Sequence, residues 1–128
     1  MIVAGIGCRK GASANEIGAA ITAALSRAGL RHDALGLIAA PALKRDEPGI
    51  AAAATDLGVP LVLVPQADLE AAGSRTTTRS ARVVALMGVP SAAEAAALAA
   101  GGPAARLLAP RIAVGPATCA LATNEGAS

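Results

Sequence analysis

Two short charged segments contain the residues whose types and spacing could support chemistry. The first, GIGCRKGASANEI at positions 5–17, places the thiol of Cys8 beside the cations Arg9 and Lys10. Neighbouring cations and a following helix N-terminus lower the pKa of a thiol and favour the nucleophilic thiolate, so Cys8 is a candidate nucleophile. The only histidine, His32, lies in another predicted loop and offers no nearby base. We therefore favour a buried and unreactive thiol.

The same loop could bind an anion. Ser13 and Glu16 have the S-x-x-E spacing of a capping box, which predicts that a helix begins here. Free N–H groups at the helix start, its dipole and the two cations could hold a carboxylate or a phosphate, which makes Ser13 a candidate ligand-binding residue. The glycine and lysine spacing matches neither the dinucleotide fingerprint nor the P-loop. For this loop taken alone we favour the alternative, a glycine-permitted turn with solvated charges.

The second charged segment is LKRDEPGI at positions 43–50, and its charged residues are Lys44, Arg45, Asp46 and Glu47. It follows a predicted strand. In an open parallel sheet the loops after the carboxyl ends of the strands lie along one edge, where ligands commonly bind. We therefore expect the two charged segments to face the same side. The two acidic residues could equally serve only to cap the next helix.

The elements that must position these residues alternate between strands and helices. Strands are predicted at 2–6, 35–40 and 61–64, and helices at 13–28, 47–57 and 66–72. The continuous Leu/Val run of the third strand is typical of a strand buried on both faces. This alternation predicts an α/β fold, with a mostly parallel central sheet of about five strands flanked by helices.

The second half of the chain is less regular. The polar stretch 74–80 is predicted to be a mobile surface loop, and 83–87 a short helix. Ser91 and Glu94 repeat the capping-box spacing before an alanine-rich helix. Two short strands within 106–123, separated by Gly-Pro, are predicted to form a hairpin or neighbouring edge strands, which adds an antiparallel strand near the C-terminus.

Composition limits the functions that the chain can have. Its 128 residues suffice for one domain, which we expect to span 1–128. No Phe, Tyr or Trp is present to stack on a base, and the net charge of +2 is too small for a nucleic-acid partner. No uncharged run of about 20 residues could span a bilayer, which predicts a soluble, cytoplasmic protein without a membrane partner. One histidine and two distant cysteines predict no metal site and no bound cofactor.

Four segments occur in an order and spacing that resemble a known family. They are GIGCRKGASANEI, LKRDEPGI, MGVPSAAEAAALAAGG and, last, LLAPR followed by ATCALAT. They are similar to the family formed by CobE and the C-terminal domain of CbiG, both of cobalamin biosynthesis. The resemblance covers Ile2 to Thr123 and implies a compact α/β domain with a role in corrin-ring synthesis. The site residues that it implies, motif by motif, are Gly7, Cys8, Arg9, Lys10, Lys44, Asp46, Glu47 and Gly49.

The resemblance and the charged segments lead to three hypotheses. The first is a protein that binds a precorrin or corrinoid intermediate or assists another enzyme of the pathway. Arg45 then joins the implied residues, because a macrocycle ringed with carboxylates suits a cationic edge. The second is an enzyme that opens the lactone of a precorrin intermediate, as the resemblance to CbiG implies, with Asp46 or Glu47 as general base and Cys8 as nucleophile. The third is a small anion-binding module that uses only the first helix N-terminus.

Overall fold

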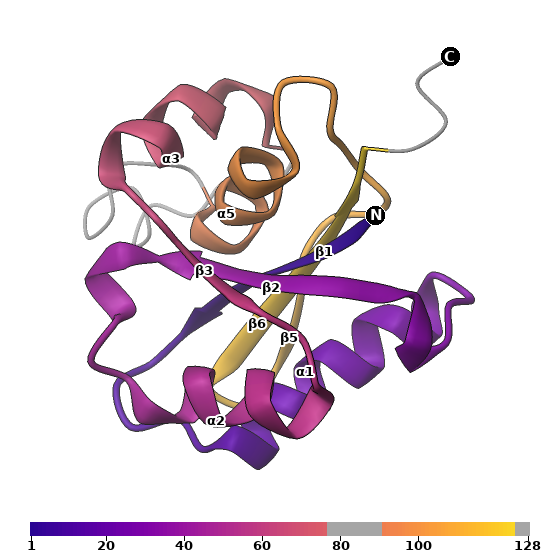
Figure 1. Ribbon diagram of the computed structural model, residues 1–128, viewed down its shortest axis with the longest axis vertical. Helices are drawn as coiled ribbons and strands as arrows, with labels where there is room; N and C mark the ends of the chain where they lie inside the picture. Colours follow the sequence, from indigo (N-terminus) through magenta and orange to yellow (C-terminus); the bar gives the residue numbers. More distant parts are fainter. Residues whose placement is uncertain (77–90, 125–128) are drawn as a thin grey trace.

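The fold is built on a six-stranded sheet with β1 at its centre (Figure 1). The computed structural model describes residues 1–76 and 91–124. The order across the sheet is β3-β2-β1-β6-β4, and β5 pairs with β6. The strands are β1 (Ile2–Cys8), β2 (Leu35–Pro41), β3 (Leu61–Val64), β4 (Arg106–Leu107), β5 (Ile112–Val114) and β6 (Ala117–Thr123).

Strand direction confirms the predicted mostly parallel sheet. β2 pairs parallel with β1, and β3 pairs parallel with β2. β6 returns antiparallel beside β1, with Ile2 opposite Thr123 at one end and Cys8 opposite Ala117 at the other. Because β4 and β5 are both antiparallel to β6, only β6 runs against the other strands of the described sheet. β5 and β6 form the predicted C-terminal hairpin, and β6 is the predicted antiparallel strand.

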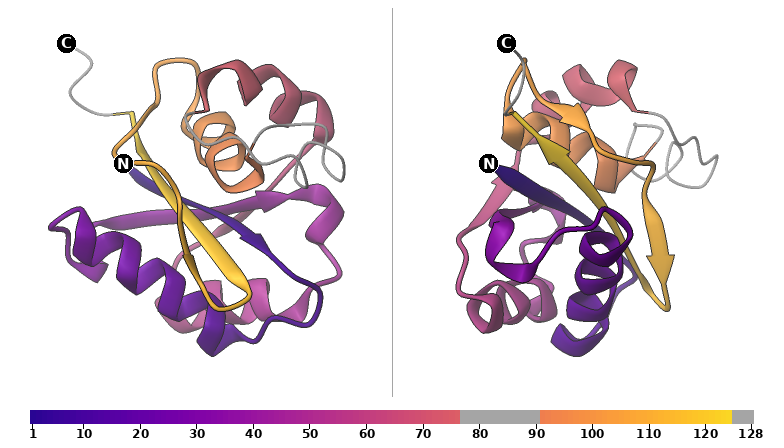
Figure 2. Two further views of the ribbon diagram at one scale, coloured as in Figure 1. Left: turned by 180° about the vertical axis from the view of Figure 1, so that it is seen from behind. Right: turned by 90° about the vertical axis from the view of Figure 1, so that its right-hand side faces the viewer.

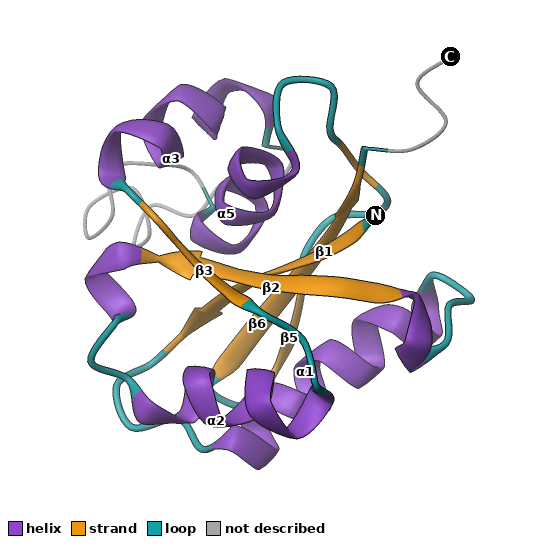
Figure 3. Ribbon diagram, viewed as in Figure 1, coloured by secondary structure: helices purple, strands orange, loops and turns teal. Residues whose placement is uncertain are grey.

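Helices cover both faces of the sheet, as Figures 2 and 3 show. They are α1 (Ala14–Arg27), α2 (Pro48–Leu57), α3 (Gln66–Ala72) and α5 (Ala92–Gly101). Successive side chains of a strand point to opposite faces, so Ile6 of β1 joins the apolar core under α1 and α2, while Val3 joins the core under α3 and α5. The sheet therefore separates two aliphatic cores.

The sequence of α1 explains both its start and its packing. The Ser13 hydroxyl accepts from the Glu16 N–H at 3.1 Å, and the Glu16 carboxylate accepts from the Ser13 N–H at 2.9 Å, which completes the predicted capping box. Ile17, Ile21 and Leu25 follow at four-residue spacing and are buried. The cap fixes the start of α1 just after β1, beside the first charged segment.

Small residues bring α5 close to the centre of the sheet. A Cβ on Gly5 would meet the carbonyl oxygen of Ala93 and would lie 2.6 Å from the backbone nitrogen of Ala97. Only glycine leaves room for the helix backbone at this distance. Since Ala93 lies near the start of α5 and also faces Gly7, α5 begins at the carboxyl end of β1 and runs back along the strand.

The second capping box forms only in part. The Ser91 hydroxyl accepts from the Glu94 N–H at 3.3 Å, as predicted. The Glu94 side chain, however, is buried, and its Oε2 accepts from the Arg111 N–H at 2.9 Å. A buried carboxylate needs such donors, so this glutamate ties α5 to the segment before β5 instead of closing its own cap.

Three parts of the sheet differ from the prediction. β1 continues beyond residue 6 to Cys8, because its ladder with β6 extends that far. β3 lies at the sheet edge, so Val62 and Leu63 are 37% and 38% exposed and the prediction of a strand buried on both faces was wrong. β4 was not predicted, since its two residues are strand only through pairing with the end of β6. The predicted helix 83–87 and most of the predicted loop 74–80 lie outside the described residues.

Candidate functional site

The two charged segments meet at one edge of the sheet. β1 and β2 are parallel neighbours, so their carboxyl ends lie together, on the left in Figure 1. We call residues 9–13, after β1, the first loop and residues 42–47, after β2, the second loop; the edge that they form is the carboxyl edge. The Gly11 N–H of the first loop donates to Oε1 of Glu47 in the second at 2.7 Å. The two segments face the same side, as expected.

The start of α2 packs directly against the first loop. A Cβ on Gly49 would meet the carbonyl oxygen of Ala12 and lie 3.1 Å from the carbonyl carbon of Ser13. Pro48 occupies the first position of α2, where a missing N–H costs nothing. Glu47 is the N-cap residue but makes no side-chain cap bond, so the alternative that it serves only to cap the helix does not hold. Its carboxylate joins the loops instead.

The turn between β5 and β6 is a third segment at this edge, and sequence reasoning missed it. The Arg9 N–H donates to the carbonyl of Pro116 at 2.9 Å, and the Thr118 hydroxyl donates to the carbonyl of Gly7 at 3.1 Å. The Gly-Pro pair predicted a turn between two strands, but nothing local indicated that β6 would pair with β1. Gly7 itself lies within β1 and not in the loop.

Four backbone amides of the first loop already have acceptors within the protein. The N–H groups of Arg9, Gly11, Ala12 and Ser13 donate respectively to Pro116, Glu47, the Arg9 carbonyl and Glu16. These contacts explain the sharp path of the loop between β1 and α1. These four amides are therefore not available to the expected anion site, whereas the Ser13 hydroxyl only accepts in the cap and keeps its own O–H to donate.

The positive charges of the carboxyl edge have no internal partners. Arg9, Lys10 and Arg45 are exposed, and Lys44 is half-buried. Within residues 1–76 and 91–124 the one ion pair joins Arg31 to Asp33 at 3.8 Å, and none of these four cations donates a side-chain hydrogen bond. Three acids share the edge: the exposed Asp46, Glu47, which accepts from Gly11, and Glu16, which accepts from Ser13. The edge presents more positive than negative charge to a ligand.

Cys8 lies at the end of β1 and is half-buried. Burial raises the pKa of its thiol above the ordinary 9.0; Lys44 opposes this shift, and the Glu47 carboxylate adds to it. The expected lowering by Arg9 and Lys10 was wrong, because both side chains extend into solvent. Cys119 is buried in β6, and burial raises its pKa to about 12. Both cysteines are free thiols.

The histidine does not belong to this edge. His32 precedes β2, so it lies at the opposite edge, where its Nε2 is 2.9 Å from the Thr22 hydroxyl. The described residues contain no group of three or more His, Cys, Asp or Glu that could hold a metal ion. None of the described helices combines the length and the apolar character needed to cross a membrane.

Comparison with known proteins identifies the family. Residues 2–122 match the family described as Cobalamin synthesis G C-terminus. Protein CobE of Sinorhizobium sp. is 38% identical over 121 residues, which cover 94% of this chain and 79% of that protein. The crystal structure of CobE, described as a protein from the cobalamin (vitamin B12) biosynthetic pathway, superposes with a TM-score of 0.90 and 36% identity over 95% of this chain and 89% of the other.

Two further crystal structures have the same fold. The cobalamin biosynthesis protein chiG from Agrobacterium tumefaciens is 43% identical, with a TM-score of 0.79 over 98% of this chain and 99% of the other. A cobalamin biosynthesis protein G homologue from Sulfolobus solfataricus is 29% identical, with a TM-score of 0.71, and this chain covers only 37% of it. The chain therefore belongs to the CbiG C-terminal family and is a protein of the cobalamin biosynthesis pathway.

Proposed function

We propose that this protein binds a carboxylate-rich precorrin or corrinoid intermediate at the carboxyl edge. The observation that carries the proposal is the hydrogen bond from Gly11 to Glu47, which holds together two loops that supply four unpaired cations. Corrin precursors carry carboxylates around the ring, and several positive groups on fixed loops suit such a periphery. The four cations are Arg9, Lys10, Lys44 and Arg45.

The energetics favour several weak contacts over one strong one. An exposed ion pair contributes only about 0.2–1 kcal/mol, because water and salt screen it. A ligand with several carboxylates can form several such contacts at once and lose orientational freedom only once. Leu43, which is 66% exposed next to Lys44, adds apolar surface at the same edge. Without aromatic rings, the chain would hold such a ligand by its edge and its aliphatic surface.

A coloured, carboxylate-bearing corrinoid such as cobyrinic acid tests the proposal. Mixed with the purified protein and separated by size exclusion, it should co-elute, and its visible absorbance should appear at the protein's elution volume. Arg9→Gln and Lys44→Gln should each weaken binding about twofold to fivefold. Arg31→Gln, which removes an exposed charge at the opposite edge, serves as the matched control and should change nothing. Colour that elutes only with free ligand would overturn the proposal.

Two observations make binding a better-supported function than lactone opening. The Glu47 carboxylate, one candidate base, is engaged by Gly11, and the Cys8 thiol has a raised pKa. The hypothesis of a lactone-opening enzyme stays a prediction, with Asp46 as its exposed candidate base. Incubating the protein with a lactone-bearing intermediate and following its mass distinguishes the two, because hydrolysis of the lactone adds one water and binding alone leaves the mass unchanged. The family also suggests other enzymes of the pathway as partners. Adding such an enzyme to the same assay tests whether this protein increases its rate.

A further inference from the structure

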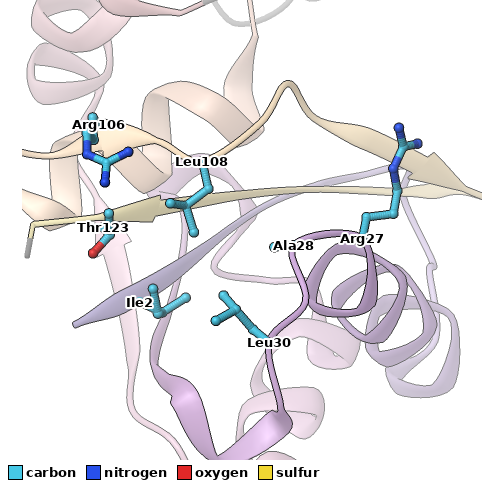
Figure 4. Close-up of a pocket in the computed structure, with 7 residues that line it drawn as sticks. All are labelled: Ile2, Arg27, Ala28, Leu30, Arg106, Leu108 and Thr123. Carbon is cyan, nitrogen blue, oxygen red and sulfur yellow. The ribbon is translucent and has the colours of Figure 1, made fainter.

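A hollow of about 640 Å³ opens at the edge of the sheet opposite the carboxyl edge (Figure 4). It lies where β1 begins, α1 ends and β4 pairs with the end of β6. It is therefore separated from the candidate site by the length of β1. The lining residues are Ile2, Arg27, Ala28, Leu30, Arg106, Leu108 and Thr123.

The floor of the hollow is aliphatic and belongs to the core. Ile2, Leu30 and Leu108 are half-buried and pack against the core under α1 and α2. Backbone hydrogen bonds fix two of them, from the Leu30 N–H to the Leu25 carbonyl at 2.8 Å and from the Leu108 N–H to the Leu121 carbonyl at 2.9 Å. The apolar surface is thus held in place before any ligand arrives, which reduces the entropy lost on binding.

Two arginines stand at opposite ends of this floor. Figure 4 shows Arg106 at one end and Arg27 at the other, with the three aliphatic side chains between them. Both arginines are exposed, and within the described residues neither side chain makes a hydrogen bond or an ion pair. Among the described residues that line the hollow, none is acidic. Its described lining therefore offers two guanidinium groups and an apolar surface, and contributes no negative charge.

We infer that this hollow is a second binding site, for a molecule with an aliphatic or alicyclic body and carboxylates on two sides. A guanidinium binds a carboxylate through two parallel hydrogen bonds, and the floor accepts the apolar body between them. The volume falls within the range of roughly 300–1,000 Å³ that is usual for small-molecule sites. A free aliphatic dicarboxylate and one side of a carboxylate-bearing macrocycle both have this chemistry.

Decanedioate is the first probe, with decane-1,10-diol as its uncharged counterpart. In methyl-labelled protein, decanedioate should shift the NMR signals of Ile2, Leu30 and Leu108, and the diol should bind more weakly. Arg27→Gln and Arg106→Gln should each weaken decanedioate binding about twofold to fivefold. The control is the Arg31→Gln/Asp33→Asn variant, which removes both members of an exposed ion pair and should leave binding unchanged. Absent methyl shifts, equal binding of the diol, or unchanged affinity in the double variant would overturn the inference. Backbone amide spectra of each variant establish that it is folded.

Cobyrinic acid in the same titration separates the two sources of the ligand. If it shifts the three methyl groups and the Arg27→Gln/Arg106→Gln variant needs more cobyrinic acid to produce the same shifts, the macrocycle is the ligand of the hollow. If decanedioate shifts them and cobyrinic acid does not, the site takes a free dicarboxylate. Cobyrinic acid whose binding depends on Arg9 and Lys44 but not on Arg27 and Arg106 supports the proposed function independently. The two proposals therefore fail separately.

Discussion

The N–H of Gly11 donates a 2.7 Å hydrogen bond to Oε1 of Glu47, a residue 36 positions further along the chain. This bond joins the loop after β1 to the loop after β2. Because both strands are parallel and adjacent, their cationic loops lie close enough for one side-chain hydrogen bond to join them. The negatively charged Glu47 thus helps to bring the positive side chains of the two loops to one edge.

Removing this carboxylate should loosen the edge without unfolding the protein. Glu47→Ala is expected to lower the free energy of unfolding by about 1 kcal/mol, because an exposed, charge-assisted hydrogen bond is lost. Glu47→Gln keeps an acceptor oxygen and should cost less. Urea denaturation followed by far-ultraviolet circular dichroism measures both, since the chain has no aromatic residue for fluorescence. Asp46→Ala is the control, and a loss as large as that of Glu47→Ala would contradict the role assigned to the bond.

Gly49 should tolerate no side chain, because its Cβ would meet the carbonyl oxygen of Ala12. Gly49→Ala must push α2 away from the first loop, and we expect a loss of about 2 kcal/mol in the free energy of unfolding. The control is Gly18→Ala in α1, where nothing lies within 4 Å of the added methyl group and where alanine should stabilise the helix by about 0.5–1 kcal/mol. The midpoint temperature of thermal denaturation should fall for Gly49→Ala and rise for Gly18→Ala. An unchanged stability of the Gly49→Ala variant would mean that α2 does not pack closely against Ala12.

The sequence predicted those parts of the molecule that depend on neighbours along the chain. The Ser13–Glu16 capping box and the spacing of Ile17, Ile21 and Leu25 are local signals, and the structure confirms both. The burial of β3 was predicted wrongly, because a Leu/Val run does not reveal that its strand will lie at the edge. The position of a strand in a sheet depends on pairing between distant segments.

The same limit applied to the candidate site. Parallel strand order correctly indicated that the two charged segments would meet. The partners of the loop amides could not be predicted, since the acceptors Pro116 and Glu47 are remote in sequence from Arg9 and Gly11. The pKa of Cys8 was predicted in the wrong direction because adjacent cations were counted while burial at the end of β1 was not.

Cys8 should react slowly at neutral pH. Its raised pKa means that the thiolate fraction below pH 9.0 is smaller than for a free cysteine, so iodoacetamide labelling should keep accelerating as the pH rises past that value. Lys44→Met removes the group that lowers this pKa and should slow labelling, whereas Glu47→Gln should accelerate it. Mass spectrometry follows the modification. A rate that is already constant below pH 9.0 would show an activated thiolate and would revive Cys8 as a nucleophile.

The control for this measurement is a Cys8→Ala variant. Its remaining thiol, Cys119, is buried in β6 with a pKa of about 12, so the native protein should label very slowly. Denaturant should then expose Cys119 and restore fast labelling. Rapid labelling of native Cys8→Ala protein would mean that β6 opens readily, and the rates assigned to Cys8 would need correction for this background.

Salt should weaken corrinoid binding, and the Kd should rise more steeply the more cations contact the ligand. Between roughly 0.1 M and 1 M salt the Debye length falls from about 10 Å to about 3 Å, so contacts at exposed Arg9 and Lys10 are largely screened. The Arg9→Gln/Lys44→Gln variant has fewer such contacts, and its Kd should change less with salt than that of the wild type. Absorbance titration with cobyrinic acid measures both. Equal salt dependence in the two proteins would mean that the ligand binds elsewhere. A smaller salt dependence in the Arg27→Gln/Arg106→Gln variant, titrated in parallel, would then identify the hollow at the opposite edge as its site.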